Sequence, residues 1–140
     1  MKVLFDTNVL IDAITCRDDF KNQKKLMRYV ANETIEAYIS SKQITDIYYI
    51  LRKYVSSETE KRRILRIIME QFETLPCLKS LCEYCLRSNI EDYEDAVIDE
   101  TAKIFNVGYI VTNNIDDFKN SKQTIITPRE LVILLEAMNQ

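Results

Sequence analysis

The sequence contains no histidine and no tryptophan, and it has a single glycine, Gly108, in 140 residues. Without histidine, the chain has no imidazole general base, no Ser-His or Cys-His dyad and no imidazole metal ligand. One glycine excludes the glycine-rich loops that bind phosphates in dinucleotide-binding and Walker-type proteins. Any enzymatic chemistry must therefore rest on carboxylates, thiols, lysines or hydroxyls.

Long hydrophobic runs are also missing. No apolar segment approaches the ~18 residues of a membrane span, and the first residues lead into an expected strand rather than a signal peptide. Hydrophobic residues make up 46% of the chain and charged residues 29%, as is typical of globular proteins. We therefore expect one domain over residues 1–140, cytoplasmic and without membrane association, with its four cysteines reduced.

The net charge of −3, from 22 acids and 19 bases, argues against a nucleic-acid partner at first sight. The arrangement of the charges changes this interpretation. If the six aspartates singled out below share one site, 16 acids remain against 19 bases. The surface outside that site would then be slightly basic.

Short apolar runs alternate with amphipathic stretches along the whole chain. The expected strands are Val3–Phe5, Ile35–Ser40, Leu75–Leu78, Tyr109–Thr112 and Thr124–Ile126. Helices are expected between them, and their first turns are marked by Asp18 or Asp19, Ser41, Ser57, Asp92 and Pro128. Strands joined through helices predict an α/β fold, with a parallel sheet covered by helices on both faces.

Asp6 directly follows the first strand, in the segment MKVLFDTNVLID. Open α/β sheets bind ligands at the carboxyl ends of their strands, so Asp6 is expected to face a crevice. Thr7 and Asn8 serve as turn and helix-start residues. The alternative is that Asp6 only caps the helix that follows.

A second acidic segment, IEDYEDAVIDE, spans residues 90–100. Asp92 and Asp95 are three residues apart, so they share one face at the start of the expected helix. Acids are common at helix starts, and a cap is again the alternative. Glu91 and Glu94 exceed what a cap requires, and their repulsion favours a nearby cation.

Two further regions contribute oxygen-bearing side chains. In YIVTNNIDDF, an apolar strand ends at Thr112 and is followed by Asn114, Asp116 and Asp117, although such residues also form ordinary polar turns. Asp46 lies near the start of a helix that follows a strand, where an exposed aspartate is the alternative. Carboxylates thus collect at one predicted edge of the sheet. Mg²⁺ or Mn²⁺ takes such ligands without histidine, and a pair of these ions supports phosphodiester hydrolysis.

The order DTNVLID, ITDIYYILRK, DYEDAVIDETAKIFNVGYIVTNNIDDF and ITPREL resembles the PIN-domain family, whose best-known members are the VapC-type ribonuclease toxins. The resemblance covers essentially the whole chain. It implies a three-layer fold with a five-stranded parallel sheet and metal-dependent cleavage of single-stranded RNA. It also implies an antitoxin partner and a homodimer, for which the tyrosine-rich helix Thr45–Tyr54 would supply the interface.

The resemblance also implies roles for individual residues. The catalytic set is Asp6, Asp46 and Asp95; the ligands of Mg²⁺ or Mn²⁺ are Asp6, Asp92, Asp95 and Asp117; the supporting residues are Thr7, Asn8, Thr112, Asn114 and Asp116. Asp46 stands where most members carry glutamate, and Asn114 where many carry aspartate. These departures keep open a catalytically degraded module that binds nucleic acid or protein. An aspartate-based phosphotransfer domain is disfavoured, since DTN lacks a second acid and no lysine follows Thr112.

Other groups have simpler explanations. Cys77, Cys82 and Cys85 form a C-x₄-C-x₂-C pattern without a clear fourth ligand, so buried thiols are expected. The basic run Lys61–Arg66 suits a solvated helix face better than RNA contact. Tyrosines of the Thr45–Tyr54 helix could stack on bases, although packing is the more common role.

Overall fold

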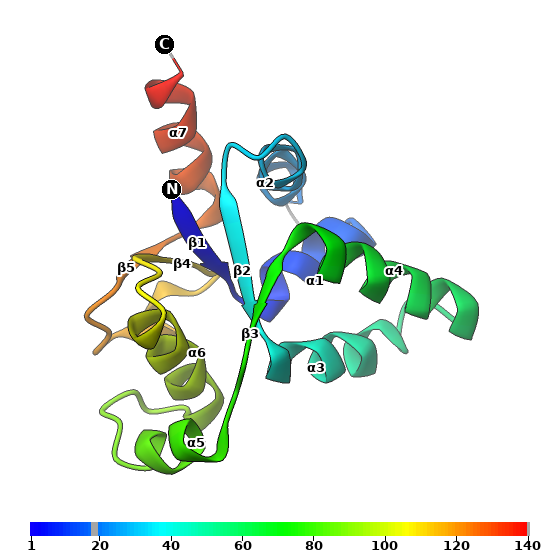
Figure 1. The fold of residues 1–140 in the computed structure, drawn as a ribbon. Coiled ribbons are helices and arrows are strands. Elements are labelled where there is room, and N and C mark those ends of the chain that lie inside the picture. Colours follow the sequence, from blue (N-terminus) through cyan, green and yellow to red (C-terminus); the bar gives the residue numbers. More distant parts are fainter. Residues whose placement is uncertain (18–19, 140) are drawn as a thin grey trace.

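A computed structural model describes residues 1–17 and 20–139. Within these residues, five parallel strands form one sheet in the order β3-β2-β1-β4-β5 (Figure 1). The strands are β1 (Lys2–Phe5), β2 (Glu36–Ser40), β3 (Glu73–Leu75), β4 (Tyr109–Val111) and β5 (Thr124–Ile126). The predicted five-stranded parallel sheet is confirmed.

Strand β1 occupies the centre of the sheet. Val3 pairs with Ala37 of β2 on one side and with Tyr109 of β4 on the other. Val3, Leu4 and Phe5 have no exposed surface. A strand buried on both faces needs apolar side chains at every position, which is why this run lacks the alternation of a half-exposed strand.

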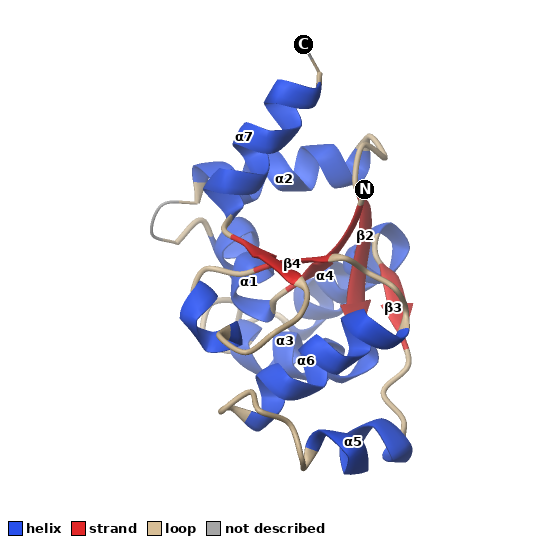
Figure 2. Ribbon diagram, turned by 90° about the vertical axis from the view of Figure 1, so that its left-hand side faces the viewer, coloured by secondary structure: helices blue, strands red, loops and turns tan. Residues whose placement is uncertain are grey.

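Helices cover both faces of the sheet (Figure 2). The helical segments are α1 (Thr7–Thr15), α2 (Lys21–Ala31), α3 (Ser41–Leu51), α4 (Glu58–Gln71), α5 (Lys79–Cys85), α6 (Tyr93–Ile104), the 3₁₀ turn η1 (Ile115–Phe118) and α7 (Pro128–Met138). The larger core lies between the sheet and α1, α2, α3, α4 and α7, and the smaller core lies between the sheet and α5 and α6. The predicted three-layer arrangement is therefore confirmed.

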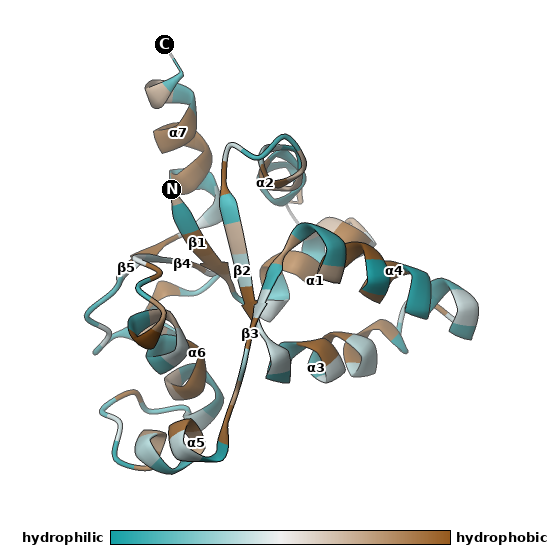
Figure 3. Cartoon of the chain, viewed as in Figure 1, coloured by the Kyte–Doolittle hydropathy of each residue, from teal (hydrophilic) through white to brown (hydrophobic). Residues whose placement is uncertain are grey.

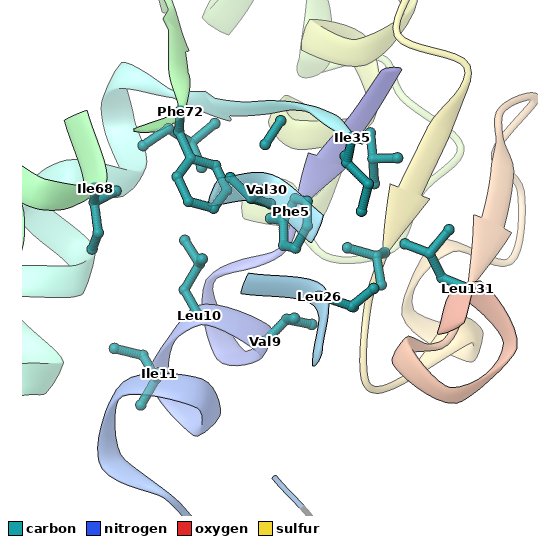
Figure 4. Packing of buried hydrophobic residues seen from close by; sticks show 14 of the residues in the cluster. Phe5, Val9, Leu10, Ile11, Leu26, Val30, Ile35, Ile68, Phe72 and Leu131 are labelled. Atoms are coloured by element: carbon teal, nitrogen blue, oxygen red, sulfur yellow. The ribbon is translucent and has the colours of Figure 1, made fainter. Parts of the chain in front are cut away.

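The two cores follow from the alternation of side chains along each strand. Val3 and Phe5 point into the larger core and Leu4 points into the smaller one. Phe5 meets Phe72 edge to face, with 5.2 Å between ring centroids (Figure 4). The apolar sides of the helices turn toward the sheet and their polar sides face outward (Figure 3), as expected of amphipathic helices.

Several helices begin where the sequence predicts. Ser57 accepts a hydrogen bond from the backbone N–H of Glu60, Asp92 caps α6, and Pro128 is the first residue of α7. These starts depend on local hydrogen bonds between residues two or three positions apart, which a sequence displays directly.

Two local predictions are wrong. Ser40, not Ser41, caps α3, because Ser40 keeps an extended backbone and its side chain accepts from the N–H of Lys42. The strand expected at Leu75–Leu78 is instead Glu73–Leu75; it begins two residues earlier and ends at Leu75, since Pro76 has no N–H to continue the ladder. The caps expected at Asp18 or Asp19 lie outside the described residues. Among the helices of the described chain, none is both long and apolar enough to cross a membrane.

Candidate active site

The site is built where the strand order reverses. The chain leaves β1 for β2 on one side, and β3 crosses over to β4 on the other side. The carboxyl ends of β1 and β4 therefore border the crevice in which such sheets bind ligands. Asp6 follows β1 and Thr112 follows β4, and the hydroxyl of Thr112 donates to Oδ2 of Asp6 over 2.9 Å.

Asp6 is partly buried and held at both of its oxygens. Its Oδ1 accepts from the backbone N–H of Thr7 over 3.0 Å, so Asp6 also caps α1. Burial is the main cause that raises the pKa of Asp6 above its ordinary value; the hydrogen bonds from Thr112 and Thr7 oppose it, and nearby Asp117 adds to it. The site thus holds a carboxylate whose charge is not fully compensated by its neighbours.

Asp95 lies in the first turn of α6. Its backbone N–H donates to Oδ1 of Asp92, the N-cap residue, over 3.1 Å. Burial, the largest cause, and repulsion from Asp6, Asp92 and Asp117 together raise the pKa of Asp95 to about 7. A helix N-terminus favours a carboxylate by at most about 2 kcal/mol, and here burial and like charges outweigh that effect. Asp6, Asp95 and Asp117 therefore converge from three separate elements.

The loop after β4 orients Asp117. Asn114 donates from Nδ2 to Oδ1 of Asp117 over 3.1 Å, and its own Oδ1 caps η1 by accepting from the N–H of Asp116. The N–H of Asn114 in turn donates to the hydroxyl of Thr112. Thr112, Asn114 and Asp117 thus form one chain of hydrogen bonds that ends at Asp6, whereas Asp116 lies outside the cleft described next.

These residues border a cleft of about 430 Å³, here called the acidic cleft. Its lining is Asp6, Thr7, Asn8, Lys42, Asp46, Tyr49, Ile50, Asp92, Glu94, Asp95, Ile98 and Asp117. Asp46 is half-buried in α3 and forms an ion pair with Lys42, with 3.0 Å between Nζ and Oδ2. Asp46 is not among the groups that raise the pKa of Asp6 or Asp95, so it lies at the margin of the cluster.

Gln43 is a structural residue that the sequence interpretation missed. It is fully buried, and its Nε2 donates to the carbonyl of Phe5 over 2.8 Å and to the hydroxyl of Thr7 over 3.2 Å. Its Oε1 accepts from the N–H of Ser40 over 2.7 Å. Gln43 therefore fixes the start of α3 against the end of β1. The available signal was the Ser-x-x-Gln capping box at Ser40.

A second missed group lies behind the cleft. Asn113 donates to Oδ2 of Asp12 over 2.7 Å and accepts from Nε2 of Gln23 over 3.2 Å. This network joins α1 and α2 to the loop after β4, the loop that carries Thr112 and Asn114. Lys42, which the sequence interpretation did not single out, also lines the acidic cleft, together with Tyr49 and Glu94.

The donor chemistry of the cluster suits a hard divalent cation. Every candidate ligand offers carboxylate oxygens, the preference of Mg²⁺ and Mn²⁺, and the mutual repulsion at Asp95 would be relieved by a cation. In residues 1–17 and 20–139, however, no group of three or more histidine, cysteine or acidic side chains is already arranged around one point. Shared ligation would require side-chain rotation, and the ligand roles of Asp6, Asp92, Asp95 and Asp117 stay predictions.

The parallel sheet with aspartates at its switch point defines the class of protein. The sequence matches the PIN domain family over residues 2–116, and the chain belongs to this family. A comparison with curated proteins gave no match.

Solved structures share the fold. VapBC2 from Rickettsia felis, bound to a DNA fragment from their promoter, has 23% identity and a TM-score of 0.66, covering 91% of this chain and 98% of that chain. A toxin–antitoxin complex from Klebsiella pneumoniae has 25% identity and a TM-score of 0.67, covering 90% and 97%. PAE2754 from Pyrobaculum aerophilum has 17% identity and a TM-score of 0.69, covering 98% and 90%.

Neutralising Asp95 should stabilise the metal-free protein. We expect Asp95→Asn to raise its melting temperature at pH 8 by about 3–5 °C, or roughly 1 kcal/mol once solvent screening is included. The carboxyl of Asp95 has its ordinary pKa of 3.8 in the unfolded chain and a pKa of about 7 in the folded chain. Wild-type stability should therefore fall as pH rises from about 4 to 7, and the advantage of the variant should grow over the same range. Thermal melts in EDTA measure both effects.

Asp116→Asn is the matched control, since Asp116 is also an acid in a first helical turn but is exposed and lies outside the acidic cleft. It should change stability by less than about 0.5 kcal/mol. An Asp95→Asn protein that melts below wild type would mean that Asp95 serves the helix N-terminus and not a charged cluster.

Proposed function

We propose that this protein is a metal-dependent endoribonuclease that cleaves single-stranded RNA, and that it acts as the toxin of a toxin–antitoxin pair. The observation that carries the proposal is the convergence of Asp6, Asp95 and Asp117 on one cleft, where Asp117 raises the pKa of Asp6 and both Asp6 and Asp117 raise the pKa of Asp95. Membership of the PIN domain family, whose members are in general nucleases, supports the reaction class. Two of the similar structures contain toxin–antitoxin assemblies, VapBC2 and the complex from Klebsiella pneumoniae, which supports the toxin role.

In this proposal Asp6 and Asp95 hold the principal ion, Mg²⁺ or Mn²⁺, and Asp92 and Asp117 enlarge its site. The bound ion would lower the pKa of a water and stabilise charge on the phosphate, which suits a chain without histidine. Thr112 and Thr7 hold the two oxygens of Asp6 in place. These contacts fix the carboxylate orientation of Asp6 before any ligand arrives, so Asp6 itself needs little reorganisation.

Lys42 and Asp46 are proposed to act on the substrate side of the cleft. Lys42 is half-buried and lowers the pKa of Asp6 through its charge, so it lies close to the cluster as well as to Asp46. A lysine beside acidic residues supplies a positive contact for a phosphate oxygen. Asp46, one methylene shorter than glutamate, would orient that lysine and extend the ligand set.

The alternative is a degraded module that binds nucleic acid or protein without cleaving it. Asn114 and Asp46 are the residues that favour it. Asn114 nevertheless has a defined position, since it orients Asp117 and caps η1. Because Asn114 orients Asp117, the carboxylate of Asp117 can serve as a metal ligand although position 114 carries an amide. The cleavage experiment below distinguishes the two proposals.

Purified protein should cleave single-stranded RNA in Mg²⁺ or Mn²⁺ and lose that activity in EDTA. Asp6→Asn should lower the rate of cleavage at least about a hundredfold. It removes the negative charge of the carboxylate that Thr112 and the N–H of Thr7 hold in place. Wild type should also gain about 2.7 kcal/mol of stability at a hundredfold excess of Mn²⁺ over its dissociation constant. Gel-resolved cleavage of a labelled oligonucleotide and thermal melts measure the two effects.

Asp116→Asn again serves as the control and should retain cleavage. Activity that survives both EDTA and Asp6→Asn would overturn the metal-dependent mechanism. RNA binding without cleavage in wild type would favour the degraded module.

We propose that Tyr49 stacks on a base of the RNA. Its side chain lines the acidic cleft and is 62% exposed, with the guanidinium of Arg52 5.5 Å from the ring centroid. Because a stacked base contributes about 1–3 kcal/mol, we expect Tyr49→Ala to raise KM about tenfold and to leave kcat within about twofold. Tyr49→Phe should retain the wild-type KM, since stacking does not use the hydroxyl.

Steady-state cleavage assays separate these parameters. Tyr54→Ala is the control, because Tyr54 is 44% exposed but does not line the acidic cleft. A fall in kcat without a change in KM for Tyr49→Ala would contradict the stacking role.

An antitoxin and a second copy of the chain are the proposed protein partners. The antitoxin gene is to be sought in a short reading frame that overlaps upstream. For the homodimer, the interface expected on Thr45–Tyr54 is partly used within the chain, since Tyr48 donates to Glu58 over 2.7 Å and Tyr54 contacts Arg17. We propose instead the exposed apolar residues on and beside α5 and α6, which are Leu78, Tyr84, Ile104 and Phe105.

Light scattering should give about twice the 16.5 kDa of one chain. Ile104→Glu should give the monomer mass, because it buries a charge in an apolar interface. The control is Ile133→Glu on α7, at a residue of similar exposure, 55% against 53%. A monomeric wild type at all concentrations tested would refute the dimer.

A further inference from the structure

Two of the four cysteines face each other at the start of α5. Sγ of Cys77 and Sγ of Cys82 are 3.7 Å apart, and both residues are partly buried. Cys85 is nearby but buried, and its thiol donates to the carbonyl of Ala96 on α6 over 3.5 Å. Cys16 is exposed at the end of α1. The geometry therefore selects one pair out of four thiols.

The chemistry of this pair is that of a dithiol. A zinc centre needs four ligands, but the nearby cysteines provide three and the chain has no histidine. A disulfide requires only the two facing sulfurs, which must move about 1.6 Å closer to reach a bond of ~2.05 Å. Cys77 lies in the connection before α5 begins at Lys79, outside the helix, so this movement does not require α5 to unwind.

We propose that Cys77 and Cys82 form a reversible disulfide, a redox modification site beside the acidic cleft. The oxidant is a small-molecule disulfide such as oxidised glutathione. One thiolate attacks it, forms a mixed disulfide and releases the first glutathione thiol. The second cysteine then attacks the protein sulfur of that mixed disulfide and releases the other glutathione. Two protein thiols are thereby oxidised and one disulfide is reduced to two thiols.

The surroundings support this pairing over the alternatives. Burial raises the pKa of Cys85 to about 11, which keeps it as an unreactive thiol. Lys42 and a hydrogen bond from Ser40 partly oppose the rise in the pKa of Cys77 caused by burial. The thiol of Cys77 thus lies close to Lys42 of α3 and Ser40 of β2, whereas Cys85 is directed into the interface with α6.

The pair also contacts both helices that carry cleft carboxylates. The backbone N–H of Cys77 donates to the hydroxyl of Ser41, the first residue of α3, over 3.0 Å. The carbonyl of Cys82 accepts from the hydroxyl of Tyr93, the first residue of α6, over 2.7 Å. Figure 1 shows β3, α5 and α6 around this corner. A bond between the two sulfurs therefore forms directly against the starts of α3 and α6.

The test uses the full chain equilibrated in glutathione buffers of increasing oxidised fraction, followed by alkylation of free thiols and mass spectrometry. Wild type should lose two hydrogens and retain two alkylatable thiols. Trypsin cleaves after Lys79, so a Cys77–Cys82 bond should join the peptide Ile67–Lys79 to the peptide Ser80–Arg87. Dithiothreitol should separate the two peptides.

Matched variants distinguish the pair from other thiol chemistry. Cys16→Ser and Cys85→Ser should still form the joined peptides. Cys77→Ser and Cys82→Ser should not, and each should instead accumulate a glutathione adduct on the remaining partner; thermal melts confirm that each variant is folded. Three results would overturn the proposal. They are a wild-type protein that forms glutathione adducts but no joined peptides, a disulfide within the peptide Ser80–Arg87, and a dimer linked through Cys16. None of these readouts depends on RNA cleavage.

Discussion

Strand β1 has neither a free edge nor a free face, and the rest of the structure depends on its burial. β2 and β4 pair with it on both sides, and a helical layer packs against each face. Because the pairing is parallel and the side chains alternate, a shift of one residue would exchange the two cores. The position of Asp6 at the end of this strand is therefore as fixed as the core itself. Thr112 lies opposite it because Phe5 pairs with Val111.

The acidic cleft shows two opposing electrostatic effects in one place. Helices α1, α3 and α6 all begin beside it, and their N-terminal N–H groups favour anions. Burial and mutual repulsion work against these groups, and the raised pKa values of Asp6 and Asp95 show that repulsion and burial prevail. Such an excess of negative charge is characteristic of functional sites rather than of caps alone. Asp92 takes part in both effects. It caps α6 by accepting from the N–H of Asp95, and its charge raises the pKa of the Asp95 carboxyl.

Much of this arrangement could be predicted from the sequence, because its signals are local. The apolar run before Asp6, the cap at Asp92 and Pro128 in the first turn of α7 each involve neighbours in the chain. Gln43 and Asn113 escaped prediction because their partners, Phe5 and Asp12, are distant in the sequence and become neighbours only in the folded sheet. The ion pair between Lys42 and Asp46 could not be predicted from the sequence either, since either side chain could have turned to solvent. The start of α3 was misplaced by one residue because two adjacent serines offer the same hydroxyl.

The parallel topology also separates the ends of the chain from the acidic cleft. The strands are parallel, and their carboxyl ends lie on the side of the sheet that carries Asp6 and Thr112. The first residues of β1 therefore lie at the opposite end of the strands. Helix α7 starts after β5 at the cleft edge and returns antiparallel to the strands, beside α2 (Figure 1). The N-terminus and the end of α7 consequently emerge on the same side, away from the cleft. An affinity tag, a fluorophore or a surface tether attached at either end would leave the mouth of the cleft open to a long polymer.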